Sequence, residues 1–384
     1  MIYVHVPFCR SFCTYCGFYS EVAPKCRKEE ETSKQEARIE GYIRALEAEI
    51  GARRKDIDRV FASSDVNTLY IGGGTPSVLP LSAFERLVAT IGPRKYNEFT
   101  VEVNPEDIVE NGVDYVLGLL DLGVNRISMG IQSFDDEILK FMNRRHSVVQ
   151  AVEAYRILEE AGVGNISIDL IFGLPQLSPQ KWRETIDKAL NISATGVPPK
   201  HISAYQLSIE PDSMLEKLMA KGRFEEASAE QCRQQYEILC KELADAGYHH
   251  YEISNFGQPG FEARHNSAYW RNIPYVGFGP GAHSYIGNRR SWNISSLASY
   301  VETDDFSKIR ESEILDSEQL VMERIMLGLR TSTGVEESFL MSHCDNPAVE
   351  SAIEGGHLVR IDGQRIRIPE SSFFISDNII ASII

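Results

Sequence analysis

Six short strand-like segments recur along the first part of the chain, and helical periodicity follows each of them. The segments are residues 2–6, 67–71, 99–103, 126–131, 166–172 and 201–207. Regular alternation of strands and helices is typical of βα units that build a parallel sheet. Six units are too few for a closed barrel of eight strands. The pattern therefore predicts an α/β fold, as either a partial (β/α)6 barrel or an open doubly wound sheet.

The pattern changes after about residue 210. Long helical segments occupy residues 214–247, and a loop region rich in Gly and aromatic residues follows at 251–292. Residues 317–331 have the pattern of an amphipathic helix, residues 358–370 that of a hairpin around Asp362 and Gly363, and residues 376–384 that of a capped final helix. We therefore predict three parts: a barrel over 1–210, an extension over 211–300, and a helical, winged-helix-like domain over 301–384.

Length and composition are those of an ordinary globular protein. The 384 residues are 43% hydrophobic and carry a net charge of −16, which argues against a large nucleic-acid surface. The chain has no apolar run long enough to span a membrane. Arg10 and the nearby cysteines interrupt any signal-peptide core. We expect a cytoplasmic protein without a transmembrane segment.

Three cysteines stand directly after the first strand-like segment. Cys9, Cys13 and Cys16 have the spacing C-x3-C-x2-C, whereas the other four cysteines are scattered. In a reducing compartment, a tight cysteine cluster indicates a metal or cluster site rather than disulfide bonds. The spacing therefore predicts three thiolate ligands on one loop.

The type of metal site follows from the number of ligands. A structural zinc site needs four, and neither His5 nor Cys26 completes a standard zinc spacing. Thiolates are the usual ligands of iron–sulfur clusters, and three of them on a four-iron cubane leave one iron open. An iron–sulfur cluster is therefore favoured, while an unusual zinc site or buried free thiols remain alternatives.

Glycines and polar residues follow or interrupt the next strands. The second strand ends in Gly72, Gly73 and Gly74, which would form a tight turn or let a ligand approach the backbone. Glu102 and Asp169 lie in the third and fifth strand segments, and Gln132 directly follows the fourth. A carboxylate in a buried parallel strand is costly without a partner. Polar residues on three successive strands therefore indicate a lined pocket rather than separate ion pairs.

The cysteine spacing after a first strand resembles the signature of the radical SAM superfamily. The resemblance implies a [4Fe–4S] cluster whose open iron chelates the amino and carboxylate groups of S-adenosylmethionine (SAM). It also implies that an electron from the cluster can cleave SAM to a 5′-deoxyadenosyl radical. The glycines after the second strand resemble the family motif that contacts the methionine end of SAM.

Within this superfamily, nearly the whole chain is similar to the oxygen-independent coproporphyrinogen III oxidase-like group. The similar segments include YVHVPFC, GGGTPS, VEVNPE, NRISMGIQSF, IDLIFGLP, HISAYQLSIEP, HNSAYW and GPGAHS. By position, the resemblance implies a set of SAM-pocket residues: Tyr3, Tyr15, Gly73, Gly74, Thr75, Glu102, Gln132, Arg144 and Asp169. For Arg144 a solvated helix face is the plain alternative. One departure is RIRIPESSFF, where relatives more often have a Thr-x-x-Gly turn, and it puts the form of the wing in doubt.

Three branches of the group compete: HemN-type oxidases, HemW-type heme chaperones and heme-degrading methyltransferases. HemN-type chains have a further cysteine at the position of Phe18, and an N-terminal extension before the cluster loop. HemW-type chains have an H-N-x-x-Y-W motif, which matches His265, Asn266, Tyr269 and Trp270 here. The resemblance therefore favours a heme chaperone, with heme, a heme-recipient protein and an electron donor as partners. Whether the chain is also an enzyme stays open.

The H-N-x-x-Y-W residues have chemistry that suits heme. Imidazole is a common ligand of heme iron, and Tyr and Trp offer flat apolar faces. The alternative is that His265 and Trp270 pack the loop region against the barrel. His283, the pair His249 and His250, and His146, which resembles a position beside the SAM pocket, are rival histidines.

Overall fold

The computed structural model of the protein describes residues 1–23, 29–211 and 213–384. The position of Cys26 therefore lies outside the described residues, as does the start of the polar stretch at residues 25–35. Within the described part of the chain, no helix is long and apolar enough to cross a bilayer, in line with the sequence-based expectation.

The six predicted strands are confirmed, and they pair in parallel. They are β1 (Ile2–Val6), β4 (Thr68–Gly73), β5 (Glu98–Val103), β6 (Arg126–Gln132), β7 (Ile166–Phe172) and β8 (His201–Gln206). Three more strands join them: β11 (Val276–Phe278) lies parallel to β1, and β10 (Asn255–Gly257) and β9 (His249–Glu252) follow β8 in antiparallel order. In the described residues β11 and β9 are the two edges of this sheet, so it remains an open, partial barrel.

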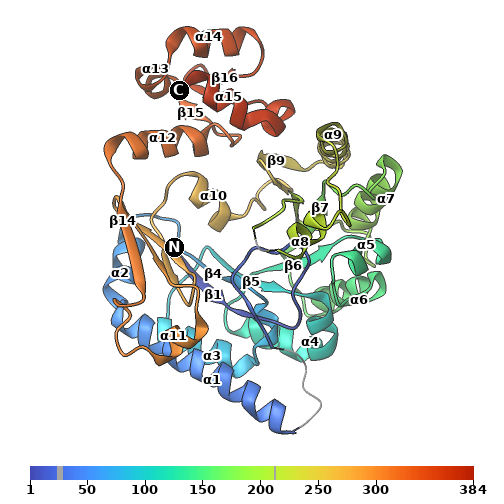
Figure 1. The fold of residues 1–384 in the computed structure, drawn as a ribbon, viewed down its shortest axis with the longest axis vertical. Coiled ribbons are helices and arrows are strands. Elements are labelled where there is room, and N and C mark those ends of the chain that lie inside the picture. Colours follow the sequence, from blue (N-terminus) through green and yellow to red (C-terminus); the bar gives the residue numbers. More distant parts are fainter. Residues whose placement is uncertain (24–28, 212) are drawn as a thin grey trace.

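Helices form an outer layer on the sheet (Figure 1). They are α1 (Glu29–Ala52), α2 (Arg54–Ala62), α3 (Leu81–Ile91), α4 (Pro105–Asp121), α5 (Asp136–Phe141), α6 (Val148–Glu160), α7 (Pro179–Leu190), α8 (Met214–Ala220) and α9 (Ala229–Asp245). Local sequence fixes where several begin: Ser147 and Gln150 form a capping box at α6, and Pro105 occupies the first turn of α4. Between the sheet and the helices lies an apolar core that includes Phe99, Ile127 and Trp182.

The segment after α9 returns to the sheet. Besides β9, β10 and β11 it contains α10 (Arg264–Trp270), α11 (Leu297–Glu302) and a small sheet of β12 (His283–Ile286), β13 (Arg289–Asn293) and β14 (Arg310–Ile314). Short strands β2 (Phe8–Cys9) and β3 (Glu21–Val22) flank the cysteine loop. Residues 211–300 thus share the sheet of the barrel, and the three domain boundaries stay predictions.

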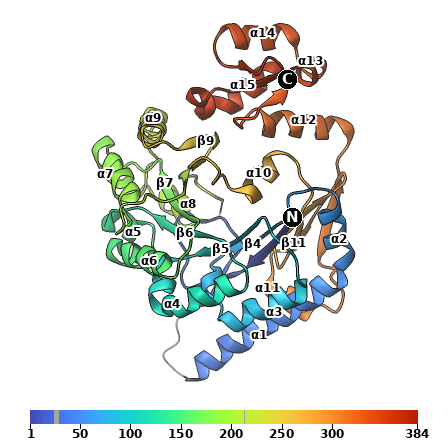
Figure 2. The same ribbon diagram turned by 180° about the vertical axis from the view of Figure 1, so that it is seen from behind.

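The C-terminal residues form a separate layer at one end of the molecule (Figures 1 and 2). Its elements are α12 (Ser317–Gly328), β15 (Val335–Glu336), α13 (Glu337–His343), α14 (Asn346–Glu354), β16 (Val359–Ile361), β17 (Arg365–Arg367), the 3-10 helix η2 (Glu370–Ile375) and α15 (Ser376–Ile383). The predicted hairpin is confirmed, with Asp362 and Gly363 in the left-handed region at φ of 52° and 65°.

Two details of the C-terminal prediction are wrong. Within the helix α12 itself, Ile325 is the one fully buried side chain, so the predicted amphipathic character is weak. The final helix α15 exists, but no side chain caps its start, because the N-cap position is Ile375. Ser376, the expected cap, lies inside the helix, and its hydroxyl accepts a hydrogen bond from Arg330 instead.

Candidate functional site

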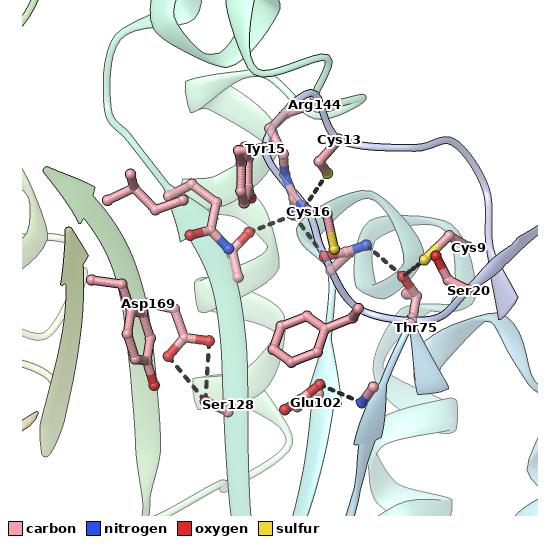
Figure 3. A pocket seen from close by; sticks show the side chains of 18 of the residues that line it. Cys9, Cys13, Tyr15, Cys16, Ser20, Thr75, Glu102, Ser128, Arg144 and Asp169 are labelled. Carbon is pink, nitrogen blue, oxygen red and sulfur yellow. Dashed lines mark hydrogen bonds between the residues drawn. The ribbon is translucent and has the colours of Figure 1, made fainter. Parts of the chain in front are cut away.

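A cavity of about 550 Å³ runs along the sheet to the carboxyl ends of the central strands. The cysteine loop that follows β1 closes it on one side, and residues from β4 through β8 form the wall opposite (Figure 3). Ligand sites in α/β folds gather at these strand ends, because the loops that follow the strands converge there. The volume is within the usual range of small-molecule sites.

All three loop cysteines line this cavity, and none forms a disulfide. The Thr75 hydroxyl donates to the Cys9 sulfur over 3.5 Å, and the Arg144 guanidinium donates to the Cys13 sulfur over 3.4 Å (Figure 3). Burial raises the pKa of Cys9 and raises that of Cys16 to about 11. Positive charge and hydroxyl donors are what a thiolate ligand set needs around it.

The donor set fits an iron–sulfur cluster better than a single metal ion. Among the described residues, no three His, Cys, Asp or Glu side chains converge on one point, as a mononuclear zinc site requires. His5 is not a fourth ligand, because Tyr3 donates to its Nδ1 over 2.9 Å and its Nε2 donates to the carbonyl of Tyr19 over 2.8 Å. A four-iron cubane, in contrast, takes each thiolate on a different iron atom.

Glu102 lies in the wall below the cysteine loop (Figure 3). Tyr70 donates to one carboxylate oxygen over 2.6 Å and the Gly73 amide donates to the other over 3.0 Å. Burial raises the pKa of Glu102 to about 7, with the charge of Asp169 as a smaller cause. Tyr70 and Gly73 therefore hold the Glu102 carboxylate in place as a hydrogen-bond acceptor in the cavity wall.

Asp169 lines the same wall on β7. The Ser128 hydroxyl lies 3.1 Å and 3.3 Å from its two carboxylate oxygens (Figure 3). Burial raises the pKa of Asp169 to about 6, which hydrogen bonds from Ser203 and Ser128 partly offset. The predicted lined pocket thus contains two half-buried carboxylates on different strands.

Arg144 lines the cavity, so the alternative interpretation of Arg144 as a solvated residue on a helix face is wrong. Besides Cys13, its guanidinium donates to Asn104 over 2.6 Å and to the carbonyl of Gly130 over 2.7 Å. Gln132 has a positive φ of 69°, at a shift in register between β6 and β7. A left-handed non-glycine residue at a strand irregularity is a strained position of the kind found at functional sites.

The cavity collects nearly all of the predicted SAM-pocket residues. Those that line it are Tyr15, Gly73, Gly74, Thr75, Glu102, Gln132, Arg144 and Asp169. Tyr3 does not line the described cavity; its hydroxyl donates to His5, and its ring lies 6.2 Å from that of the cavity residue Tyr70. Sequence reasoning missed the wall residues Asn104, Ser128, Ser203 and Tyr205. A signal existed for Ser128 and Ser203, because each is a polar residue between two apolar neighbours in a predicted strand.

The H-N-x-x-Y-W motif occupies α10, and its four residues point to different places. The Glu98 carboxylate accepts from the amides of Arg264 and His265 over 2.7 Å and 3.1 Å and so fixes the start of this helix. His265 is buried and makes hydrogen bonds with Thr68 over 2.7 Å and Tyr269 over 3.0 Å. Burial lowers the pKa of His265 to about 3.

The other two residues of the motif reach two cavities. Asn266 lines the cysteine cavity, and Trp270 lines a second cavity below the C-terminal layer. His265 and Tyr269 are engaged with each other, so both ring nitrogens of His265 already have partners in this structure. His265 and Tyr269 of the motif therefore contact each other, whereas Asn266 and Trp270 line cavities.

Three of the rival histidines do not line the cysteine cavity, and the fourth, His146, lies next to its wall. His250 is buried and stacks on Phe256, whereas His249 is exposed beside Glu262. His283 is exposed on β12 and stacks on Trp292. His146 is buried next to the wall, where its Nε2 donates to the Ile131 carbonyl over 3.0 Å.

Comparison with known proteins identifies the relatives. A model of the radical SAM superfamily matches residues 3–189. The heme chaperone HemW of Bacillus subtilis is 33% identical over 344 residues, which cover 87% of this chain and 84% of that one. The HemW heme chaperone of Lactococcus lactis is 33% identical over 98% of this chain and 95% of its own length.

A solved structure confirms the fold. Coproporphyrinogen III oxidase (HemN) from Escherichia coli, described as a radical SAM enzyme, superimposes with a TM-score of 0.76 at 22% identity, over 99% of this chain and 89% of that one. Membership of the radical SAM superfamily implies a [4Fe–4S] cluster and SAM as cofactors. The match to HemW proteins over most of both chains goes further: this chain belongs to the HemW family of radical SAM proteins.

Proposed function

We propose that this protein is a heme chaperone that holds a [4Fe–4S] cluster on Cys9, Cys13 and Cys16, binds SAM beside it, and passes heme to a recipient protein. The observation that carries the proposal is the cavity that three free thiols, Arg144 and the half-buried carboxylates of Glu102 and Asp169 line together. The relatives named heme chaperones supply the heme part of the proposal.

Each wall residue has a role that its contacts support. Thr75 and Arg144 donate to cysteine sulfurs and would stabilise them as thiolates. Glu102, held by Tyr70 and Gly73, would accept hydrogen bonds from the polar groups of SAM. Bound in this cavity, the cluster supplies an open iron for SAM and an electron that can cleave it. Gln132 and Asp169 would line the side of SAM away from the loop.

Phe18 separates this proposal from oxidase chemistry. At the position where HemN-type chains have a further cysteine, this chain places a side chain that is 71% exposed on the cavity rim. The likeness to HemN in the solved structure concerns the fold alone. No feature of the described residues favours propionate decarboxylation or methyl transfer, so heme transfer is the function we propose, in the cytoplasm and with an electron donor and a recipient as partners.

The test is heme binding and release by the reconstituted protein. Hemin is titrated into protein that contains its cluster, and the Soret absorbance is followed; loaded protein is then mixed with a heme-free acceptor hemoprotein. Saturable binding and transfer at a stoichiometric level support the proposal. In a parallel anaerobic assay with SAM, a reductant and coproporphyrinogen III, repeated turnover to protoporphyrinogen would overturn it.

A further inference from the structure

The middle of the cysteine loop lies on the turn that ends α5, residues 141–144, which we call the α5 turn. The Thr14 amide donates to the Met142 carbonyl over 3.1 Å, and the Thr14 hydroxyl donates to the Phe141 carbonyl over 3.3 Å. Because Thr14 and Phe141 are 127 residues apart along the chain, this contact joins two separate parts of the fold. It holds the loop at a point between its second and third cysteines.

Asn143 adds a further contact between the α5 turn and the loop. Its side-chain amide donates to the Phe12 carbonyl over 2.6 Å, and among the described residues no other donor binds this carbonyl. The Phe12 side chain is 53% exposed, so packing does little to fix this part of the loop. The amide of Asn143 is therefore the hydrogen-bond donor that ties Phe12 to the barrel.

The α5 turn thus binds loop residues 12–14 one after another. The Cys13 sulfur accepts from Arg144, which is also part of this turn (Figure 3). Arg144 donates at the same time to the carbonyl of Gly130 on β6. The α5 turn therefore sets where the second cysteine of the loop lies relative to the cavity wall.

The backbone of Asn143 is left-handed, at φ of 58°. The Asn143 amide donates to the Lys140 carbonyl over 3.1 Å, and the Arg144 amide donates to the Leu139 carbonyl over 2.9 Å; together they form the Schellman pattern of a helix end. This position favours Gly or Asn, because other side chains are strained in the left-handed region. Gly would end α5 equally well, whereas Asn also supplies the donor for Phe12.

We propose that Asn143 is a positioning residue for the iron–sulfur cluster. Its side-chain amide holds the Phe12 carbonyl and so keeps Cys13 beside Arg144, with the sulfur in the cavity. In the described part of the chain Asn143 makes no hydrogen bond to a sulfur, so it acts through the backbone of the loop. This inference rests on the proposed function in one respect, since it assumes that the three loop cysteines hold a cluster. Heme binding does not enter it.

The rate at which the full-length, cluster-loaded protein loses iron tests this role. Asn143→Gly removes the donor and keeps the left-handed backbone. After anaerobic reconstitution this variant should bind iron almost normally, because all three cysteines remain. Bathophenanthroline should then remove the iron roughly threefold faster than from the unchanged protein, because the loss of one hydrogen bond makes opening of the loop that much more frequent. The decay of the visible cluster absorbance measures the rate.

Asn143→Asp separates hydrogen-bond donation from side-chain shape. Asp has nearly the size of Asn and tolerates a left-handed backbone, but an ionised carboxylate cannot donate to the Phe12 carbonyl. This variant should therefore lose iron at least as fast as Asn143→Gly.

Asn272→Gly is the matched control, because Asn272 ends α10 in the same way. Its φ is 53°, its amide donates to the Tyr269 carbonyl over 3.0 Å, and the Ile273 amide donates to the Ala268 carbonyl over 3.0 Å. Within the described residues, the Asn272 side chain makes no hydrogen bond. Asn272→Gly should therefore lose iron as slowly as the unchanged protein. The melting temperature of the cluster-free protein should change little, and by a similar amount, in both Gly variants, because opening of the loop is a local event.

The outcomes separate the two proposals. If the unchanged protein holds no cluster, the proposed function itself fails. If it holds one and Asn143→Gly loses iron no faster than Asn272→Gly, the function stands and the role of Asn143 is overturned. The role is also overturned if Asn143→Asp keeps its iron as the unchanged protein does, because side-chain shape would then suffice. A melting temperature that falls in Asn143→Gly alone overturns it too, because Asn143 would then support the fold as a whole.

Discussion

The imidazole of His265 stacks on the ring of Tyr70, with 5.0 Å between the ring centroids and 29° between the ring planes. Tyr70 in turn donates to Glu102 over 2.6 Å. His265 is held from behind by Thr68 and Tyr269. The histidine of the H-N-x-x-Y-W motif therefore supports the hydrogen-bond donor of a predicted SAM-pocket carboxylate.

We predict that His265→Ala weakens SAM binding. The substitution leaves a space behind Tyr70, which loosens the hydrogen bond to Glu102; a loss of about 1 kcal/mol or more, roughly fivefold in affinity, is expected. Calorimetric titration of cluster-loaded protein with SAM measures it. A double-mutant cycle with Tyr70→Phe should show clear non-additivity, because both changes act on one contact chain.

His249→Ala is the control, because His249 is exposed, contacts Glu262, and lies on β9, which is not a neighbour of the Tyr70 strand β4 in the sheet. Equal SAM affinity in His265→Ala and the unchanged protein would contradict the coupling. If the coupling holds, weaker heme binding by a His265 variant cannot by itself be taken as evidence of axial ligation to iron.

The three cysteines of the loop should be individually essential for the cluster. Cys9→Ala, Cys13→Ala and Cys16→Ala should each lose most of the iron and the visible charge-transfer absorbance after anaerobic reconstitution, because two thiolates do not hold a cubane. Cys344→Ala, a free cysteine in the C-terminal layer, is the matched control and should keep both. A full iron content in any of the three loop variants would remove that cysteine from the ligand set.

Most of the fold could be predicted from sequence because each of the six parallel strands is a local run of apolar residues and their alternation with helices is regular. The short strand β11 could not, because Val276, Gly277 and Phe278 lie in a glycine-rich loop and become a strand by pairing with Ile2, Tyr3 and Val4. Pairing at such sequence separation leaves no local pattern. The same reason hides β9 and β10, which join the sheet at β8.

The residues of the candidate site could be predicted where they belong to a sequence motif. They could not be predicted where the direction of a side chain determines which cavity it lines. The cysteine loop and the carboxylates on β5 and β7 were found because cysteine spacing and buried charge are local signals. The placement of the H-N-x-x-Y-W residues in two different cavities could not be predicted. It depends on Glu98, which binds the first amides of α10 although it lies 166 residues away along the chain. That contact decides that Asn266 and Trp270 reach two different cavities.

The ionised carboxylate of Glu102 should lower the stability of the folded protein, although the same carboxylate is proposed to bind SAM. Burial holds its pKa at about 7, above the ordinary 4.5, so the folded state binds the proton more tightly than the unfolded state. The loss of stability caused by ionised Glu102 is absent at low pH, grows as the pH rises from about 4.5 to about 7, and reaches its full value above pH 7. For a shift of this size it is at most about 3 kcal/mol.

We therefore predict that Glu102→Gln raises the melting temperature of the cluster-free protein at pH 8, has little effect near pH 4.5, and weakens SAM binding. Thermal unfolding at both pH values and calorimetry with SAM measure the three effects. Glu153→Gln is the control, because Glu153 is an exposed carboxylate paired with Arg156. It should neither raise the melting temperature at pH 8 nor weaken SAM binding. A lower melting temperature at pH 8 would show that the hydrogen bonds of Glu102 outweigh its burial.

Gly74 should be required for the cysteine loop to lie against the strand ends. A Cβ at this position would lie 2.7 Å from the Phe8 carbonyl, 2.9 Å from the Val6 carbonyl and 3.1 Å from the Cys9 sulfur. The carbonyls belong to the backbone and cannot rotate away, so Gly74→Ala must displace the loop that carries the cysteines. We expect reduced iron incorporation and weaker SAM binding, with a fold that is otherwise kept. Gly51→Ala, at a helical position with nothing within 4 Å of the new Cβ, should change neither, and normal cluster content in Gly74→Ala would show that the loop tolerates a shift.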